Sequence, residues 1–92
     1  MTKIIQIPIS PTQKDLLQQE VSQNVVDGDV DRAISAILSK EGKYYICLDN
    51  SELEELIGTI CFMANHEDDR SKLAKQLDEL AEYLDPFLEN CD

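Results

Sequence analysis

The one histidine of the chain stands among polar and acidic residues, between two segments with apolar periodicity. His66 is preceded by Asn65 and followed by Glu67, Asp68 and Asp69. Carboxylates beside an imidazole favour its protonated form, which gives a pH-sensitive hydrogen-bond donor. One histidine without a recognised ligand spacing predicts no metal site. The cluster is typical of a solvated turn, in which Asp68 or Asp69 caps the next helix. The alternative is a binding site made of Asn65, His66, Asp68 and Asp69.

Three aspartates earlier in the chain have the spacing with which a calcium loop begins. Asp27, Asp29 and Asp31 alternate with other residues. The next position of such a loop requires glycine but holds Arg32, and the position of the bidentate glutamate holds Leu38. The pattern therefore favours turn and capping chemistry, with Asp29 as the expected N-cap of a helix.

Catalytic and redox motifs are not found in the sequence. No serine or cysteine lies in a nucleophile motif, and no glycine-rich phosphate loop is present. Cys47, Cys61 and Cys91 form no C-x-x-C pair, which argues against a zinc knuckle or a redox centre. We expect a non-catalytic protein without a cofactor, in which Cys47 and Cys61 are small core residues.

The charge of the chain is strongly negative and unevenly distributed. The 92 residues hold 8 Lys and Arg against 19 Asp and Glu, a net charge of −11. Residues 1–46 carry five basic and six acidic residues, a net charge of −1, and residues 47–92 carry −10. This charge argues against direct binding of nucleic acid or of an anionic membrane. An apolar content of 42% without a long apolar run predicts one globular, cytoplasmic domain over residues 1–92.

The N-terminal half predicts a strand followed by a helix. Residues 3–9 alternate so that the isoleucines at odd positions share one face. Ser10 and Gln13 match a capping box, with Pro11 between them, and predict a helix that runs to about Asn24.

The next segment has two interpretations. Apolar residues recur at helical spacing over residues 30–40, and Lys40 followed by Gly42 is typical of a helix end. We therefore expect a helix up to Lys40. The alternative is a β-hairpin over residues 33–48 that turns at Lys40-Glu41-Gly42.

The second half predicts a strand and an antiparallel α-hairpin. Residues 43–48 are rich in β-favouring residues, and Ser51 with Glu54 matches a second capping box. A glycine inside a helix costs about 1 kcal/mol relative to alanine, so Gly58 suggests a close crossing of another element. Pro86 ends the last helix. The expected fold is α+β with the order β-α-α-β-α-α.

Two features predict association with other chains. Two strands alone are marginally stable, so they need either cover by helices or a second subunit that extends the sheet, and the latter would give a homodimer. Helix capping explains acids at a helix start, but acids at a helix end are unfavourable and need another reason. We therefore expect an interaction face for an unidentified, basic protein partner. The acids assigned to it are Glu52, Glu55, Glu82, Asp85 and Glu89.

Part of the chain resembles a group of small bacterial proteins of uncharacterised activity. The resemblance covers residues 43–84, where a strand leads into a helix that ends in Ala64-Asn65-His66, followed by a second amphipathic helix. It implies a bacterial origin and marks Asn65, His66 and Asp69 as the polar residues to test first. It implies no activity.

Taken together, these patterns predict a protein that works by protein–protein interaction through its acidic C-terminal α-hairpin. Two alternatives remain open. One is a metal- or ligand-responsive module centred on His66. The other is an inhibitor of the phage type, whose acidic face mimics nucleic acid.

Overall fold

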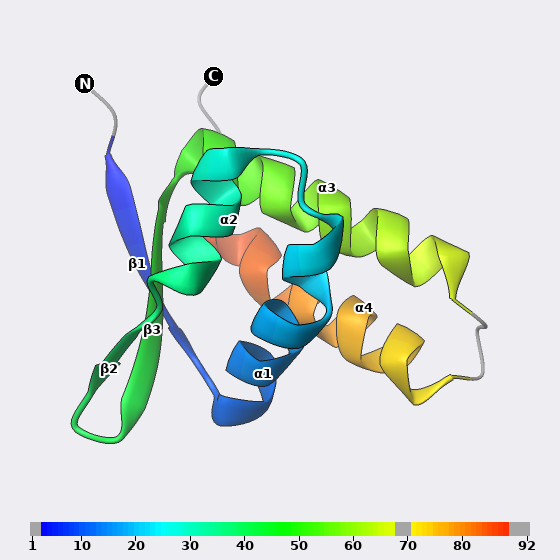
Figure 1. Ribbon diagram of the computed structural model, residues 1–92, viewed down its shortest axis with the longest axis horizontal. Coiled ribbons are helices and arrows are strands. Elements are labelled where there is room, and N and C mark those ends of the chain that lie inside the picture. The colour runs from blue at the N-terminus through cyan, green and yellow to red at the C-terminus, as the bar shows by residue number, and fades with distance from the viewer. Residues whose placement is uncertain (1–2, 68–70, 89–92) are drawn as a thin grey trace.

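Two alternating apolar segments, far apart in the sequence, pair at the centre of the fold. The computed structural model describes residues 3–67 and 71–88, and these form three antiparallel strands and four α-helices (Figure 1). The sheet has the order β1-β3-β2. In chain order the elements are β1 (Ile4–Ile9), α1 (Pro11–Gln19), the 3-10 turn η1 (Val21–Asn24), α2 (Gly28–Ser35), β2 (Leu38–Lys40), β3 (Lys43–Asp49), α3 (Asn50–His66), α4 (Lys72–Leu84) and the 3-10 turn η2 (Asp85–Phe87).

The register of β1 on β3 confirms the predicted faces of β1 and shows which residues of β3 share its apolar side. Ile5 pairs with Leu48 and Ile7 with Ile46, so the apolar positions share one side of the sheet. Ile7 and Ile46 are fully buried. The helices lie on this side, and no described helix covers the other face (Figure 1). The core therefore forms between one face of the sheet and the helices.

The prediction of a helix up to Lys40 is wrong, and the β-hairpin that the sequence left open is present. Helix α2 ends at Ser35, and β2 then pairs antiparallel with β3. Glu41 and Gly42 have φ angles of 54° and 78° and connect the two strands in a two-residue turn. Two successive positive φ angles suit the right-handed twist of a hairpin. Pairing with β3 satisfies backbone groups that an extended α2 would leave unpaired at the sheet edge.

Helix α1 begins where predicted but ends earlier. The capping box is confirmed, because the backbone N–H of Gln13 donates to Ser10 Oγ at 3.1 Å and Ser10 N–H donates to Gln13 Oε1 at 2.8 Å. The α-helix stops at Gln19, and η1 follows. Here Ser22 Oγ and Gln23 Nε2 donate to carbonyl oxygens four residues back, at 2.8 and 2.7 Å. These side chains replace backbone donors at the helix end.

The other helix starts are capped by residues other than those predicted. Asp49 and Glu52 form the capping box of α3, with bonds of 2.7 and 2.9 Å between each side chain and the backbone N–H of the other. The predicted box of Ser51 and Glu54 is wrong because α3 begins one residue before Ser51. Since Asp49 ends β3, its carboxylate can turn back over the first turn of the helix.

The starts of helices α2 and α4 are also capped by side chains other than those predicted. The carboxylate of Asp27, not Asp29, is the N-cap of α2 and accepts from the N–H of Asp29 at 2.8 Å. Ser71 caps α4 through a bond of 3.0 Å. The aspartates expected to cap this helix, Asp68 and Asp69, lie outside the described residues.

Helices α3 and α4 form the predicted α-hairpin and bury most of the core. Their apolar stripes face each other and the sheet. The hydroxyl of Tyr83 on α4 donates to the carbonyl of Pro8, which ties the hairpin to β1. Phe87 and Leu88 pack against the core after the helix ends. The buried residues of the two helices are Leu53, Leu56, Ile60, Met63, Ala64, Ala74, Leu77, Leu80, Ala81 and Leu84.

The two possible caps of α3 predict different effects of mutation. Asp49→Ala removes the acceptor for the N–H of Glu52 and should lower the free energy of unfolding by about 1 kcal/mol. Ser51→Ala should change it by less than about 0.5 kcal/mol, because the exposed Ser51 does not cap the helix. Urea denaturation followed by circular dichroism measures both. Equal losses would contradict the observed cap.

Candidate functional site

An open groove runs along the exposed side of α3. Its α3 residues recur every three to four positions, so they lie on one face of the helix. The groove has a volume of about 580 Å³. We call it the α3 groove, and its lining residues are Asn24, Val26, Ser51, Glu54, Glu55, Gly58, Thr59 and Phe62.

Gly58 lies in the middle of this groove, and the close crossing predicted for it is wrong. A Cβ atom built on Gly58 would meet nothing within 4 Å. The glycine is therefore not required by packing inside the protein. It lowers the stability of α3, since glycine costs about 1 kcal/mol relative to alanine in a helix. The space above it is open to solvent.

Two apolar side chains border this space and are exposed. Val26 is 96% exposed, and Phe62 is 60% exposed. Val26 belongs to the segment between η1 and α2, and Phe62 lies one helical turn after Gly58. Large apolar side chains that gather around a groove are typical of an interaction surface, whereas scattered ones are not.

The groove is also acidic. Glu54 and Glu55 are exposed, and neither has an ion-pair partner among the described residues. No lysine or arginine lines the groove. A partner with positive charge could therefore approach these carboxylates without displacing a cation of the protein itself.

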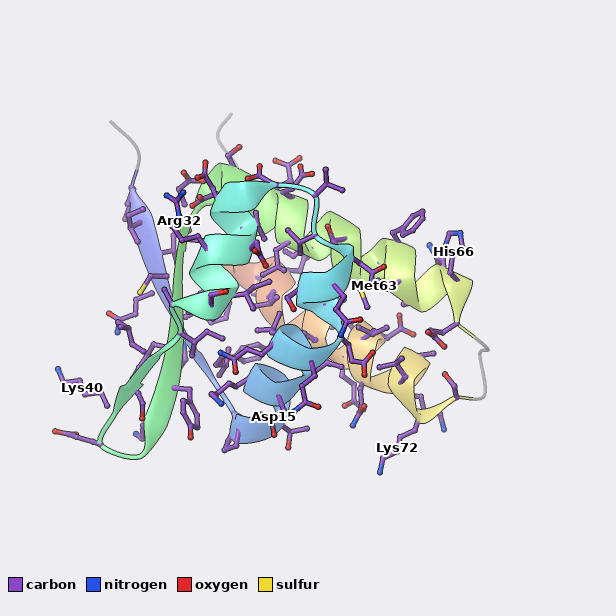
Figure 2. The ribbon with its side chains drawn as sticks, viewed as in Figure 1. Asp15, Arg32, Lys40, Met63, His66 and Lys72 are labelled. Atoms are coloured by element: carbon purple, nitrogen blue, oxygen red, sulfur yellow. The ribbon has the colours of Figure 1, made fainter. Side chains whose placement is uncertain are left out.

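His66 continues the exposed face of α3. Its Nδ1 lies 2.8 Å from the carbonyl oxygen of Phe62, and the rings of the two residues are 4.1 Å apart. Because a carbonyl only accepts, Nδ1 carries the proton in this bond. His66 and Asn65 are in the last turn of α3 rather than in a loop. Figure 2 shows His66 at the end of the helix, away from the sheet.

The structure brings together only two of the four residues of the predicted binding site. Asn65 and His66 are both exposed at the end of α3, while Asp68 and Asp69 lie outside the described residues. No group of three or more His, Cys, Asp or Glu that could hold a metal ion occurs in residues 3–67 and 71–88. Of the earlier aspartates, Asp27 caps α2, and the carboxylate of Asp29 lies 3.8 Å from the guanidinium of Arg32.

The predicted acidic interaction face is divided by the structure. Glu55 lines the α3 groove, whereas Glu52 is half-buried and its carboxylate is used in the cap of α3. Glu82 and Asp85 line a different, shallow groove of about 310 Å³ beside α4. Glu89 lies outside the described residues. The charged face is therefore not one continuous surface.

The prediction that both cysteines are core residues is wrong for Cys47 and, more clearly, for Cys61. Its side chain is exposed and lines the shallow groove, together with Ile57. Cys47 is half-buried, on the face of the sheet that the helices leave open. Apolar neighbours in the sequence did not indicate burial, because these side chains lie at the sides of the apolar stripes.

Comparison with protein families, with curated proteins and with solved structures found no match to this chain. The resemblance of residues 43–84 to small bacterial proteins stays a prediction. Within the described residues, no helix combines the length and apolar character that crossing a membrane requires. Functional conclusions therefore depend on the groove and on the charge of its residues.

Sequence reasoning missed the centre of the site. The sequence indicated no role for Val26 or Phe62, because their position at one groove requires the fold of η1 against α3. One signal was present. Gly58 stood out as an unfavourable residue in a helix, but the sequence alone did not show that the space above it is open.

The open space above Gly58 predicts that alanine is better for folding. Gly58→Ala should raise the free energy of unfolding by about 1 kcal/mol. The midpoint of thermal unfolding should rise by about 4–8 °C. Calorimetry and urea denaturation measure this gain. Lys75→Ala at an exposed position of α4 is the control and should change stability by less than about 0.5 kcal/mol. A loss of stability in Gly58→Ala would contradict the open groove.

Proposed function

We propose that this protein acts by binding a protein partner through the α3 groove. The observation that carries the proposal is Gly58, an unfavourable helix residue that leaves space for a ligand between two exposed apolar side chains. The partner segment would place an apolar side chain over Gly58, in contact with Val26 and Phe62. Lysine or arginine residues beside it would contact Glu54 and Glu55.

The energetics favour such a ligand over a purely polar one. Full burial of one large apolar side chain contributes about 1.5–3 kcal/mol. Exposed ion pairs contribute at most about 1 kcal/mol each, and they act mainly on the association rate and on the choice of partner. We therefore assign most of the affinity to Phe62 and Val26. Glu54 and Glu55 provide the selection for a basic segment.

The net charge of −11 supports the basic character of the partner. A strongly charged surface speeds the approach of an oppositely charged protein and repels acidic ones. If the partner binds nucleic acid, the protein would act as an inhibitor whose acidic surface mimics nucleic acid. If the partner has another role, the protein would be a general protein–protein interaction module.

Affinity capture from the native host, followed by mass spectrometry, identifies the partner. Binding is then measured with the purified partner by isothermal titration calorimetry. Phe62→Ala should weaken the affinity by about 10- to 100-fold, which corresponds to the apolar contribution above. Gly58→Gln should weaken binding strongly, because the longer side chain occupies the space above residue 58 that the partner's apolar side chain would take. This variant should keep the fold, since glutamine is a good helix former.

Charge variants with a matched control complete the test. The double variant Glu54→Gln, Glu55→Gln should weaken binding, and more so at low salt, because counterions screen exposed charges. Asp78→Asn with Glu79→Gln on α4 removes the same charge from exposed positions outside the α3 groove. A partner bound equally well by Gly58→Gln, or weakened equally by both double variants, would contradict the proposal.

A further inference from the structure

The exposed side of α3 carries a row of groove residues with the spacing of a helix–helix contact. The row consists of four residues at intervals of four, three and four positions, which are Ser51, Glu55, Gly58 and Phe62. Such intervals define the line along which one helix packs on another in a coiled coil. The row therefore runs along the axis of α3 for three turns, about 16 Å. We call it the α3 seam.

We propose that the partner segment that binds in the α3 groove is an amphipathic helix, basic at its C-terminal end, that lies antiparallel to α3. This inference rests on the proposed function, and it adds the conformation, the direction and the residue pattern of the partner segment. The helix places one apolar side chain beside Phe62 and a second, one turn later, over Gly58. A lysine or arginine in the turn after that contacts Glu55.

The walls of the groove favour a helix over an extended segment. In the middle of α3 the backbone N–H and C=O groups bond to one another, so they cannot pair with the main chain of an added strand. The other wall includes Val26, in the connection of three residues between η1 and α2 (Figure 1). That connection is too short to act as a sheet edge. A helix satisfies its own backbone groups and needs only side-chain contacts from the groove.

The middle of the seam can receive an apolar side chain of such a helix. The axes of packed helices lie about 8–10 Å apart, and small side chains at the contact allow the shorter distance. The space above Gly58 is empty to at least 4 Å from a built Cβ atom. Beside it, Thr59 Oγ1 donates to the carbonyl oxygen of Glu55 at 3.1 Å. An apolar side chain can therefore cover this hydroxyl without leaving its donor unpaired.

The two ends of the seam differ in charge, which determines the direction of the partner helix. Glu54 and Glu55 lie about one turn before Gly58, and Phe62 lies about one turn after it. Basic side chains are favoured in the last turn of a helix, at the negative end of its dipole. A partner helix whose last turn lies beside Glu54 and Glu55 runs antiparallel to α3. Its first turns then lie beside Phe62.

Three synthetic peptides of equal length, composition and charge test the proposal. The forward peptide has two leucines four residues apart, followed after three and four residues by two lysines, with alanine and glutamine elsewhere. The reversed peptide has the same sequence read backwards, and the alternating peptide places the leucines and lysines at every second position. Because the charge is equal, general attraction to the chain of net charge −11 is the same for all three.

Binding of each labelled peptide to the full chain is measured by fluorescence anisotropy at low salt. The forward peptide should bind at least about tenfold more tightly than the other two, since only its pattern matches the seam. Its Cα chemical shifts should become helical in the complex. Glu54→Lys with Glu55→Lys should lose the forward peptide and bind a forward peptide with glutamates in place of the lysines. Asp78→Asn with Glu79→Gln is the control and should bind the forward peptide as wild type does.

The outcomes separate this proposal from the proposed function. Equal or tighter binding of the reversed peptide, or no binding of the forward peptide up to about 1 mM, would overturn the antiparallel helix. Tighter binding of the alternating peptide that is lost in Gly58→Gln would also overturn it, but would leave the α3 groove as the binding site. Binding of the forward peptide that is unchanged in Gly58→Gln would contradict both proposals.

Discussion

The burial of one face of β3 is the constraint on which the rest of the structure depends. Ile46 and Leu48 are removed from water by the helices, while Tyr45 and Cys47 alternate with them on the open side. A chain of 92 residues buries a modest fraction of its surface, and here its four helices are used to cover a single face of the sheet. The open face of the sheet and the exposed side of α3 are both consequences of this distribution.

The sequence predicted those parts of the fold that follow from periodicity. The faces of β1 and β3, the capping box at Ser10 and the α-hairpin are all set by local spacing. The segment from Ser35 to Gly42 was predicted wrongly because its periodicity fits both structures. The hairpin forms instead of the longer helix because β2 pairs with β3. A turn with two positive φ angles makes this pairing possible.

The candidate site was less predictable than the fold for a related reason. Carboxylates are frequent in the second half of the chain, so their presence alone did not distinguish Glu55 in the groove from Glu52 in a cap. The distinction depends on which turn of α3 begins the helix, and that is fixed by Asp49 at the end of β3. Likewise, Asn65 and His66 are on the exposed face of α3 because the helix extends further than the polar sequence suggested.

The two uncovered surfaces differ in what would hold a partner on them. In the α3 groove, Gly58 lowers the stability of the helix, and the open space above it is lined by Val26, Phe62 and the carboxylates of Glu54 and Glu55. On the sheet, no such loss occurs, since the exposed residues also contribute to strand pairing. Natural proteins often retain residues that lower stability, and Gly58 is one whose open space borders exposed apolar side chains. For this reason we propose the α3 groove, rather than the open face of the sheet, as the surface for a specific ligand.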